Sequence, residues 1–437
     1  MDFIGNYILG ALVPFLLIGI GVFFLFYLKF FFIVKPKKSF SLLFKKNRGD
    51  GISPFSAMTV ALAGTLGVGN IIGVSGAMIM GGPGAVFWMI VSAFFAMVLK
   101  YAEIVLAHRH RKATEKGLCG GAMYYIEDYF GGGFGRALGS FFAAICLVNS
   151  IAMGCMLQAN AVSSSFSEMS DIPPALVGLI LAILCGAVIF RGVHDISPIT
   201  CVIIPVMTLL YVIISLFVIF KFKDNFSNAV RAIFEGAFSY KSAGGGAFGF
   251  MFSSAVRYGC MRGLLSNEAG CGTAPIAHSA SKVKLAAEQG VWGIVEVFVD
   301  TILLCTLTGL TILCVFGFDM GGFSLGEEMK LVIGAYGAAI GKTAAPIMAT
   351  MVFFFAFATI ICWAYYGNLI LSYLTKKRWV GGVYKAFYVI CILAGSYRLS
   401  EFIWQISDVT LASMTIINLV VLLLMRKEIK AETDKLF

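Results

Sequence analysis

The feature that most restricts the fold is an apolar stretch, residues 53–84, that glycines interrupt in its middle. The segment Gly64-Thr65-Leu66-Gly67-Val68-Gly69-Asn70 joins two apolar halves of membrane length. Hydrocarbon offers no partner to free backbone groups, so a broken helix persists there only where it is buried in protein or lines a wet cavity. The stretch therefore predicts a broken membrane helix. The alternative is a seam at which glycines only let helices approach each other closely.

Such a break has a chemical use. The second half-helix directs its N–H groups and the positive end of its dipole at whatever lies in the break. The first half-helix offers spare carbonyl oxygens from about Ala61 to Gly64, which suit a small cation. A site for an anionic group beside a cation, at mid-membrane depth, is typical of secondary transporters.

Composition agrees with a membrane protein. Of 437 residues, 59% are hydrophobic and 13% are charged, whereas a soluble domain carries about 25% charged residues. We therefore expect an all-α polytopic membrane protein whose residues 1–437 form one transmembrane domain. The 11 cysteines include no CxxC pair, which argues against a zinc site or a disulfide framework. The net charge of +10 is assigned to cytoplasmic loops rather than to a nucleic-acid partner.

Hydropathy predicts 11 transmembrane helices, each able to cross about 30 Å of hydrocarbon, at residues 6–34, 53–80 (broken), 83–110, 137–166, 174–191, 196–221, 247–265, 289–317, 344–374, 382–398 and 402–426. With this count, the lysine- and arginine-rich loops near residues 35–48, 109–116, 282–284, 376–378 and 426–430 all fall on one side. The positive-inside rule then places the N-terminus outside the cell membrane and the C-terminus in the cytoplasm.

The order of the segments suggests an inverted repeat. Four segments, 121–130, 226–239, 273–281 and 325–340, look amphipathic and interfacial, the first and third inside and the others outside. Without the extra helix at 6–34, the spans divide into five plus five, over residues 53–221 and 244–427. Each half begins with a glycine-interrupted span, the second at 244–272 with Gly244-Gly245-Gly246 and four later glycines. Paired broken spans predict a site at the midplane between the repeats.

Several longer motifs resemble the alanine-or-glycine:cation symporter family. They are LGVGN (66–70), GGPGAVFWM (81–89), KYAE (100–103), GGAMYYIE (120–127), QxN (158–160), SNEAGCGTAPIAH (266–278), VDTILLCT (299–306) and WAYYG (363–367). The resemblance implies a sodium-coupled amino-acid transporter with the five-plus-five, LeuT-type fold and one extra helix. Three positions depart from the family pattern: Ile90 and Ala96 follow the aromatic run, and Val68 replaces a threonine in the break.

For the substrate, the resemblance implies backbone N–H groups at Val68 and Gly69 that bind the carboxylate of a small neutral amino acid, and Gly67 is assigned to the same site. Asn70 either caps the second half-helix or contacts the substrate. Gln158 and Asn160 lie two residues apart and cannot share a helix face. We assign Gln158 to the pocket and Asn160 to a helix–helix hydrogen bond, the alternative being that both only pack.

On the span 344–374, Trp363 is assigned to the pocket wall, where its bulk would limit substrate size; the alternative is an interfacial tryptophan. Thr359 lies one turn earlier on the same face. Its hydroxyl is a candidate sodium ligand (Na+ being the co-transported ion), together with the carbonyls of Ala61 and Gly64. The alternative is a threonine that bonds back to its own helix.

Intramembrane carboxylates are functional candidates by default, and Asp300 and Glu268 are our candidates for coupling or gating. For Asp300 the expectation is an ion pair with Arg257 or Arg262, with direct ion binding as the alternative. Glu268 is expected to close a cytoplasmic loop, and Lys100 and Glu103 to form a structural i,i+3 pair.

No enzyme signature such as GxSxG, HExxH or a P-loop occurs. The sequence analysis therefore predicts sodium-coupled symport of alanine or glycine by alternating access. Two alternatives stay open: coupling to protons through Asp300, and a membrane sensor that binds the amino acid without transporting it.

Overall fold

The computed structural model describes residues 11–45, 51–114, 117–169, 172–191, 193–238, 254–318, 320–397 and 401–437. Within these ranges the chain is helical except for one antiparallel hairpin, β1 (Lys112–Thr114) and β2 (Gly117–Cys119). The hairpin connects two helices at the end of the bundle. The predicted all-α architecture is therefore confirmed apart from this short connection.

The first half of the chain contains two interrupted helices. The bend of 62° between Pro54–Thr65 and Val68–Gly81 is the predicted break, and the π-helical segment Ala152–Leu157 joins α8 to α9. The helices of this half are α1 (Val13–Tyr27), α2 (Phe31–Val34), α3 (Pro36–Leu43), α4 (Pro54–Thr65), α5 (Ile72–Gly81), α6 (Gly84–Arg109), α7 (Ala122–Phe130), α8 (Gly132–Ile151), α9 (Gln158–Ser167), α10 (Pro174–Arg191), α11 (Val193–Lys221) and α12 (Phe226–Ala237).

The second half also contains a broken helix and a π-helical segment. A non-helical turn follows Asn267, and the π-helical segment Phe298–Cys305 joins α16 to α17. Its helices are α14 (Ser254–Asn267), α15 (Pro275–His278), α16 (Ala286–Val297), α17 (Thr306–Phe316), α18 (Glu328–Ile340), α19 (Ala344–Leu374), α20 (Arg378–Tyr397), α21 (Glu401–Leu424) and α22 (Arg426–Asp434).

In the described ranges, 8 helices are long and apolar enough to cross a membrane, or 9 if the bent pair is one span. The count of eleven and the two repeats stay predictions. The continuous helix expected at 6–34 is wrong: α1 ends at Tyr27, and Lys29 and Phe30 adopt positive φ angles of 56° and 51°. Gly244-Gly245-Gly246 and the beginning of the predicted span 247–265 lie outside the described residues.

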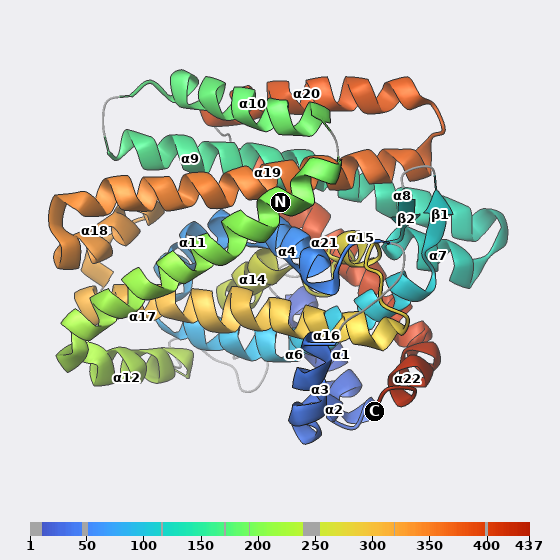
Figure 1. Cartoon of the computed structure of the whole chain (residues 1–437). Coiled ribbons are helices and arrows are strands. Elements are labelled where there is room, and N and C mark those ends of the chain that lie inside the picture. The colour runs from blue at the N-terminus through green and yellow to red at the C-terminus, as the bar shows by residue number, and fades with distance from the viewer. Residues whose placement is uncertain are drawn as a thin grey trace.

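The long helices lie roughly alongside one another, with the hairpin, α7 and α22 at one end and α12 and α18 at the other (Figure 1). We call the end with the hairpin the basic end, since Lys37, Lys112, Lys376 and Lys427 belong to its loops and short helices. At the centre of the bundle, glycine lets neighbouring helices approach each other closely. A Cβ on Gly259 of α14 would lie 2.4 Å from the Ala85 carbonyl oxygen of α6.

Candidate functional site

The first break lies between the end of α4 and the start of α5. After Thr65, the Gly67 amide turns back to the Thr65 carbonyl at 2.7 Å, and residues Val68–Asn70 form a single 3-10 turn. The Val68 N–H leaves the helical pattern altogether and donates to Oε1 of Gln158, at 3.1 Å. The break thus exposes a backbone donor, as the sequence predicted, and here a side-chain amide accepts its hydrogen bond.

Gln158 is the first residue of α9, directly after the π-helical segment. Its Nε2 donates to the Met153 carbonyl oxygen at 3.2 Å, and Gln158 is 4% exposed. A Cβ on Gly67 would lie 2.5 Å from Gln158 Oε1, so any larger residue there would displace the amide. By contrast, Asn160 donates to the Gly395 carbonyl oxygen of α20 at 3.3 Å. This is the helix–helix hydrogen bond predicted for it.

Trp363 lies behind the break. Its indole N–H donates to the Gly64 carbonyl oxygen at 3.1 Å, and its side chain is fully buried. A Cβ on Gly154 would approach Trp363 Cγ to 2.2 Å, so the ring is held between α4 and the π-helical segment. Its full burial contradicts the interfacial alternative. It stands one layer behind the cavity described next, and its role in substrate size stays a prediction.

A cavity of about 10 Å³ lies at the break. That is room for about one water molecule, so an amino acid enters only if side chains move. The described residues that line it include the backbone of the break and Gln158, with an apolar wall formed by Met153, Leu157, Leu265 and Trp404. Sequence reasoning missed this wall, because these residues belong to three different helices and no motif connects them.

Trp404 also connects the cavity to a charged pair. The Arg262 guanidinium lies over the Trp404 ring, 5.1 Å from its centroid, and its Nη1 lies 3.6 Å from Oδ1 of Asp408. The Arg262 and Asp408 side chains are 16% and 25% exposed. The pair therefore lies directly against the Trp404 wall of the cavity.

The expected ion pair of Asp300 with an arginine is wrong where it concerns Arg262, which pairs with Asp408. The Asp300 carboxylate instead accepts hydrogen bonds from Asn70 Nδ2 at 3.0 Å, Ser266 Oγ at 2.6 Å and Thr301 Oγ1 at 2.7 Å. The π-helical turn shifts the register of Phe298–Cys305, so a regular helical wheel misplaces Asp300. The carboxylate consequently joins the first break to the end of α14.

Asn70 does not cap the second half-helix. Its Nδ2 donates to both the carbonyl and the carboxylate of Asp300, at 2.7 and 3.0 Å, and α5 begins without a side-chain cap. Asn70 therefore aligns the break with the π-helical turn. Its Oδ1 is buried without a hydrogen-bond partner among the described residues, which leaves one acceptor free at the break.

The candidate sodium ligands lie on facing helices. Thr359 of α19 donates to the Phe355 carbonyl oxygen at 3.0 Å, as its alternative predicted, which leaves its oxygen lone pairs available. The Ala61 carbonyl accepts a long bond of 3.4 Å from Thr65, and the Gly64 carbonyl accepts from Trp363. The Gly64 carbonyl oxygen keeps a second lone pair, because the Val68 N–H that would bond to it in a continuous helix goes to Gln158. Among the described residues no cluster of His, Cys, Asp and Glu suits a metal ion, so a cation here would depend on neutral oxygens.

The second break follows α14. Glu268, Gly270 and Gly272 all have positive φ angles, of 50°, 84° and 78°, and the chain then turns into the short helix α15. Glu268 Oε2 accepts from Thr273 Oγ1 at 2.6 Å, which closes the loop as predicted. The Gly272 N–H donates to Glu103 Oε2 at 2.9 Å, so α6 holds this loop in place.

A buried charge network supports the second break from the basic end. Lys100 Nζ lies 3.8 Å from Glu103, in the predicted i,i+3 pair, and 3.3 Å from Glu296. Glu296 also contacts His278 Nε2 of α15 at 2.8 Å. The Oε1 atoms of Glu103, Glu268 and Glu296 lack hydrogen-bond partners among the described residues. The network ties α6, α15 and α16 together where a path toward the basic end would open.

Known proteins match this chain closely. A family model, "Sodium:alanine symporter family", matches residues 1–436. The sodium/alanine symporter AgcS of Methanococcus maripaludis is 34% identical over 99% of this chain and 97% of its own. The probable sodium/glutamine symporter GlnT of Bacillus subtilis is 30% identical over 94% of this chain and 85% of its own. The crystal structure of MhsT in complex with L-phenylalanine superposes with a TM-score of 0.60 at 13% identity, over 89% of this chain and 93% of the other.

Proposed function

This chain belongs to the sodium:alanine symporter family, and from that premise we propose that it couples sodium entry to the transport of a small neutral amino acid, alanine or glycine. The family makes it a multi-pass membrane transporter rather than an enzyme. The substrate is a separate question, since one relative is named for alanine and another for glutamine. The narrow apolar wall at the break favours a small side chain.

The observation that carries this proposal is the hydrogen bond from Val68 N–H to Gln158 Oε1. A carbonyl-type oxygen, held at the positive end of a half-helix, stands where an amino-acid carboxylate would bind. In our proposal, the substrate carboxylate replaces Gln158 at Gly67, Val68 and Gly69, and Gln158 turns to contact the ligand. Its departure would also enlarge the closed cavity.

We propose further that sodium binds between α4 and α19, at the carbonyls of Ala61 and Gly64 and the hydroxyl of Thr359. A hard cation prefers such oxygen ligands, and the carboxylate of the substrate nearby would add to its binding. Asp300 and Glu268 would take part in coupling by holding the two breaks in register. The basic end would face the cytoplasm, by the positive-inside rule.

Uptake into proteoliposomes tests the proposal. The full-length protein should accumulate labelled alanine or glycine under an inward sodium gradient and not under an equal potassium gradient. Glutamine in excess should compete weakly. Accumulation driven by a pH gradient without sodium would establish proton coupling instead, and binding without accumulation would establish a sensor.

The variant Gln158→Glu tests the carboxylate site directly. An internal carboxylate at the Val68 N–H should compete with the substrate and weaken alanine binding at least about 100-fold, or ~2.7 kcal/mol. Gln158→Ala, which removes the competitor, should still bind alanine. The matched control is Asn160→Asp, two residues away, which should leave alanine affinity near the wild-type value. Wild-type affinity in a folded Gln158→Glu protein would overturn the site assignment.

A further inference from the structure

A chain of hydroxyl groups reaches the first break from the side of α11. Thr308 of α17 donates to the Asn70 carbonyl oxygen at 2.8 Å, and its Oγ1 also lies 3.0 Å from the Leu304 carbonyl oxygen. The Tyr211 hydroxyl of α11 lies 2.6 Å from Thr308 Oγ1. Tyr211, Thr308 and Asn70 are 1%, 0% and 3% exposed. We call the Tyr211 hydroxyl, the Thr308 hydroxyl and the Asn70 carbonyl the hydroxyl relay.

The direction of the relay follows from the chemistry of its atoms. The carbonyl oxygens of Asn70 and Leu304 can only accept, so the single hydroxyl proton of Thr308 points at one of them. Thr308 Oγ1 is then left as an acceptor, and the Tyr211 hydroxyl donates to it. Each hydrogen bond in such a chain polarises the next one and strengthens it. The Tyr211 hydroxyl therefore acts on the Asn70 carbonyl through Thr308.

The Asn70 carbonyl belongs to the peptide group that closes the 3-10 turn of the break. The N–H of this peptide group, on Ile71, donates to the Val68 carbonyl oxygen at 3.2 Å. A hydrogen bond accepted by the carbonyl makes the N–H of the same peptide group a stronger donor. The relay therefore stabilises the turn whose N–H groups, at Val68 and Gly69, would bind the substrate carboxylate.

The setting of Tyr211 shows that its hydroxyl has a use besides packing. α11 packs against α17 (Figure 1) and carries exposed Leu209 and Ile213, at 59% and 53%, whereas Tyr211 is turned inward. The Tyr211 ring contacts Phe355, with 6.3 Å between the ring centroids. A phenylalanine would keep this ring contact, but it would leave Thr308 without its donor.

We propose that Tyr211 and Thr308 are positioning residues for the substrate site. They hold the 3-10 turn in the form that binds the carboxylate, without touching the substrate themselves. Because Tyr211 belongs to α11 and Thr308 to α17, the turn is held in this form only while the two helices stay in contact. The identity of the ligand rests on the function proposed above, whereas the relay does not.

Hydrogen–deuterium exchange of the full-length protein in detergent measures the turn directly, in peptides that cover residues 66–75. Tyr211→Phe removes one neutral hydrogen bond and should speed exchange there about fivefold, or ~1 kcal/mol. Thr308→Val keeps the shape and removes the whole relay, so exchange should be about 30-fold faster, or ~2 kcal/mol. Thr308→Ser keeps the hydroxyl and should stay within about twofold of the wild type.

The matched control is Tyr101→Phe, at a second buried pair of the same kind. The Tyr101 hydroxyl donates to Thr433 Oγ1 at 2.9 Å, and Thr433 donates to the Ile429 carbonyl oxygen at 2.8 Å. This pair joins α6 to α22, so its loss should leave exchange at residues 66–75 unchanged. Equal acceleration in Tyr101→Phe and Tyr211→Phe would reduce the effect to general loosening and overturn the proposal. Tyr211→Phe alone carries the test if Thr308→Val does not fold.

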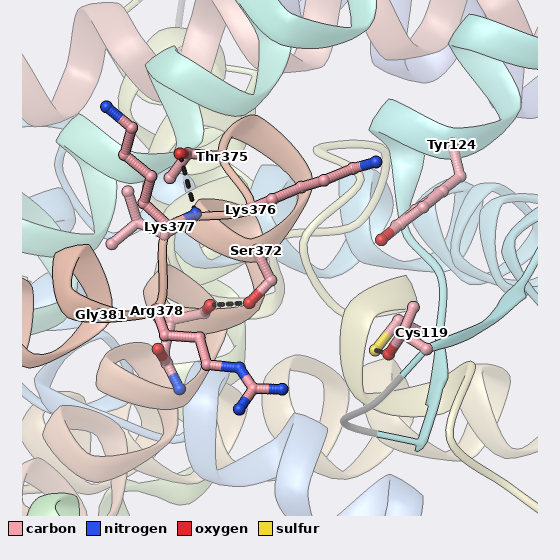
Figure 2. A pocket seen from close by; sticks show the side chains of 11 residues that line it. Cys119, Tyr124, Ser372, Thr375, Lys376, Lys377, Arg378 and Gly381 are labelled. Carbon is pink, nitrogen blue, oxygen red and sulfur yellow. Dashed lines mark hydrogen bonds between the residues drawn. The ribbon is translucent and has the colours of Figure 1, made fainter.

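Binding of alanine separates a positioning role from a merely structural one. A second cavity, of about 530 Å³, lies at the basic end and is lined by Tyr124, Lys376 and Arg378 among others (Figure 2). It has room for an amino acid, so only the sodium-dependent part of the binding is assigned to the break. That dissociation constant should rise about fivefold in Tyr211→Phe and return to the wild-type value in Thr308→Ser.

Two results would overturn the proposal. Unchanged exchange at residues 66–75 in folded Tyr211→Phe would show that the relay does not hold the turn. Faster exchange with an unchanged dissociation constant for alanine would make the two hydroxyls structural. If the wild type binds neither alanine nor glycine, the proposed function fails, while the exchange rates still decide whether the relay holds the turn.

Discussion

Asp300→Asn is the sharpest test of how the two breaks communicate. The carboxylate accepts hydrogen bonds from Asn70, Ser266 and Thr301. An asparagine has the same shape and keeps one acceptor for Asn70. Its NH2 group then faces two hydroxyls, which can rotate to accept because a hydroxyl both donates and accepts. The variant should therefore fold while losing the charge that draws the three donors together.

The size of the expected loss of uptake follows from the free energies of those three hydrogen bonds. A hydrogen bond to a charged group contributes ~1.5–3 kcal/mol and a neutral one ~0.5–1.5 kcal/mol, so the change weakens each by ~1 kcal/mol. A loss of up to ~3 kcal/mol in the alignment of the breaks corresponds to a fall of about 100-fold in sodium-driven uptake. Stability should change less, since the variant also avoids the cost of burying a charge.

Uptake into proteoliposomes and thermal unfolding of the same preparations measure the two effects. The control is Asp300→Ala, which removes the carboxylate acceptor of Ser266 and Thr301, at ~1–3 kcal/mol for each buried donor left unsatisfied, while Asn70 keeps its hydrogen bond to the Asp300 carbonyl; this variant should lower the melting temperature clearly. Wild-type uptake and sodium dependence in folded Asp300→Asn would refute the role of the carboxylate as a link. Uptake that lost a dependence on pH would favour proton coupling.

Three further predictions concern separate parts of the chain. Gly154→Ala should displace Trp363 from the Gly64 carbonyl, lower stability by ~1–3 kcal/mol through overpacking and abolish uptake. In the control Gly186→Ala, the added Cβ would meet its nearest neighbour at 3.7 Å, so both its melting temperature and its uptake should match the wild type. Thr359→Val should raise the sodium concentration for half-maximal uptake about tenfold, or ~1.4 kcal/mol, and unchanged sodium dependence would leave Thr359 a structural residue. Burial lowers the pKa of His110, but hydrogen bonds to Glu428 and Asp128 outweigh burial and raise the pKa above its usual value. The stabilisation it provides is therefore complete below about pH 6.5, the unfolded value, and is lost as pH rises through the folded pKa. Melting curves of wild type and His110→Gln should accordingly converge with rising pH, and a constant difference would contradict this.

The sequence predicted the first break because backbone chemistry is local. Glycines between apolar halves cannot continue a helix cheaply, and the structure bends there by 62°. It also predicted that Asn160 makes a helix–helix hydrogen bond, because a polar group in a membrane helix needs a partner. It predicted the loop closed by Glu268 because Thr273, the partner of Glu268, is only five residues away. The partners of Asp300 could not be predicted, because Asn70 and Ser266 belong to other segments of the chain and no motif pairs them with it.

The same limit applies to the cavity wall. Leu265 of α14 and Trp404 of α21 line the same cavity because of how these two helices pack. A single sequence contains no motif that predicts which residues of two distant helices lie opposite each other. The expectation that Trp363 lines the pocket came from family resemblance rather than from packing. The structure shows its indole N–H on the Gly64 carbonyl, and its role as a wall of the substrate pocket stays a prediction.

Two groups of ion pairs near the two breaks differ in their exposure. Toward the end away from the basic loops, the closure is the Arg262–Asp408 pair, which is partly exposed and separated by 3.6 Å. Toward the basic end, the closure is the network of Lys100, Glu296 and His278, whose side chains are at most 1% exposed. A surface ion pair contributes ~0–1 kcal/mol and separating a buried one costs ~3–5 kcal/mol, so the partly exposed Arg262–Asp408 pair lies between these limits. We therefore predict that the substrate-free protein opens more readily past Trp404. If the chain works by symport as proposed, opening toward the basic end requires that binding at the breaks first offset the cost of parting the buried network.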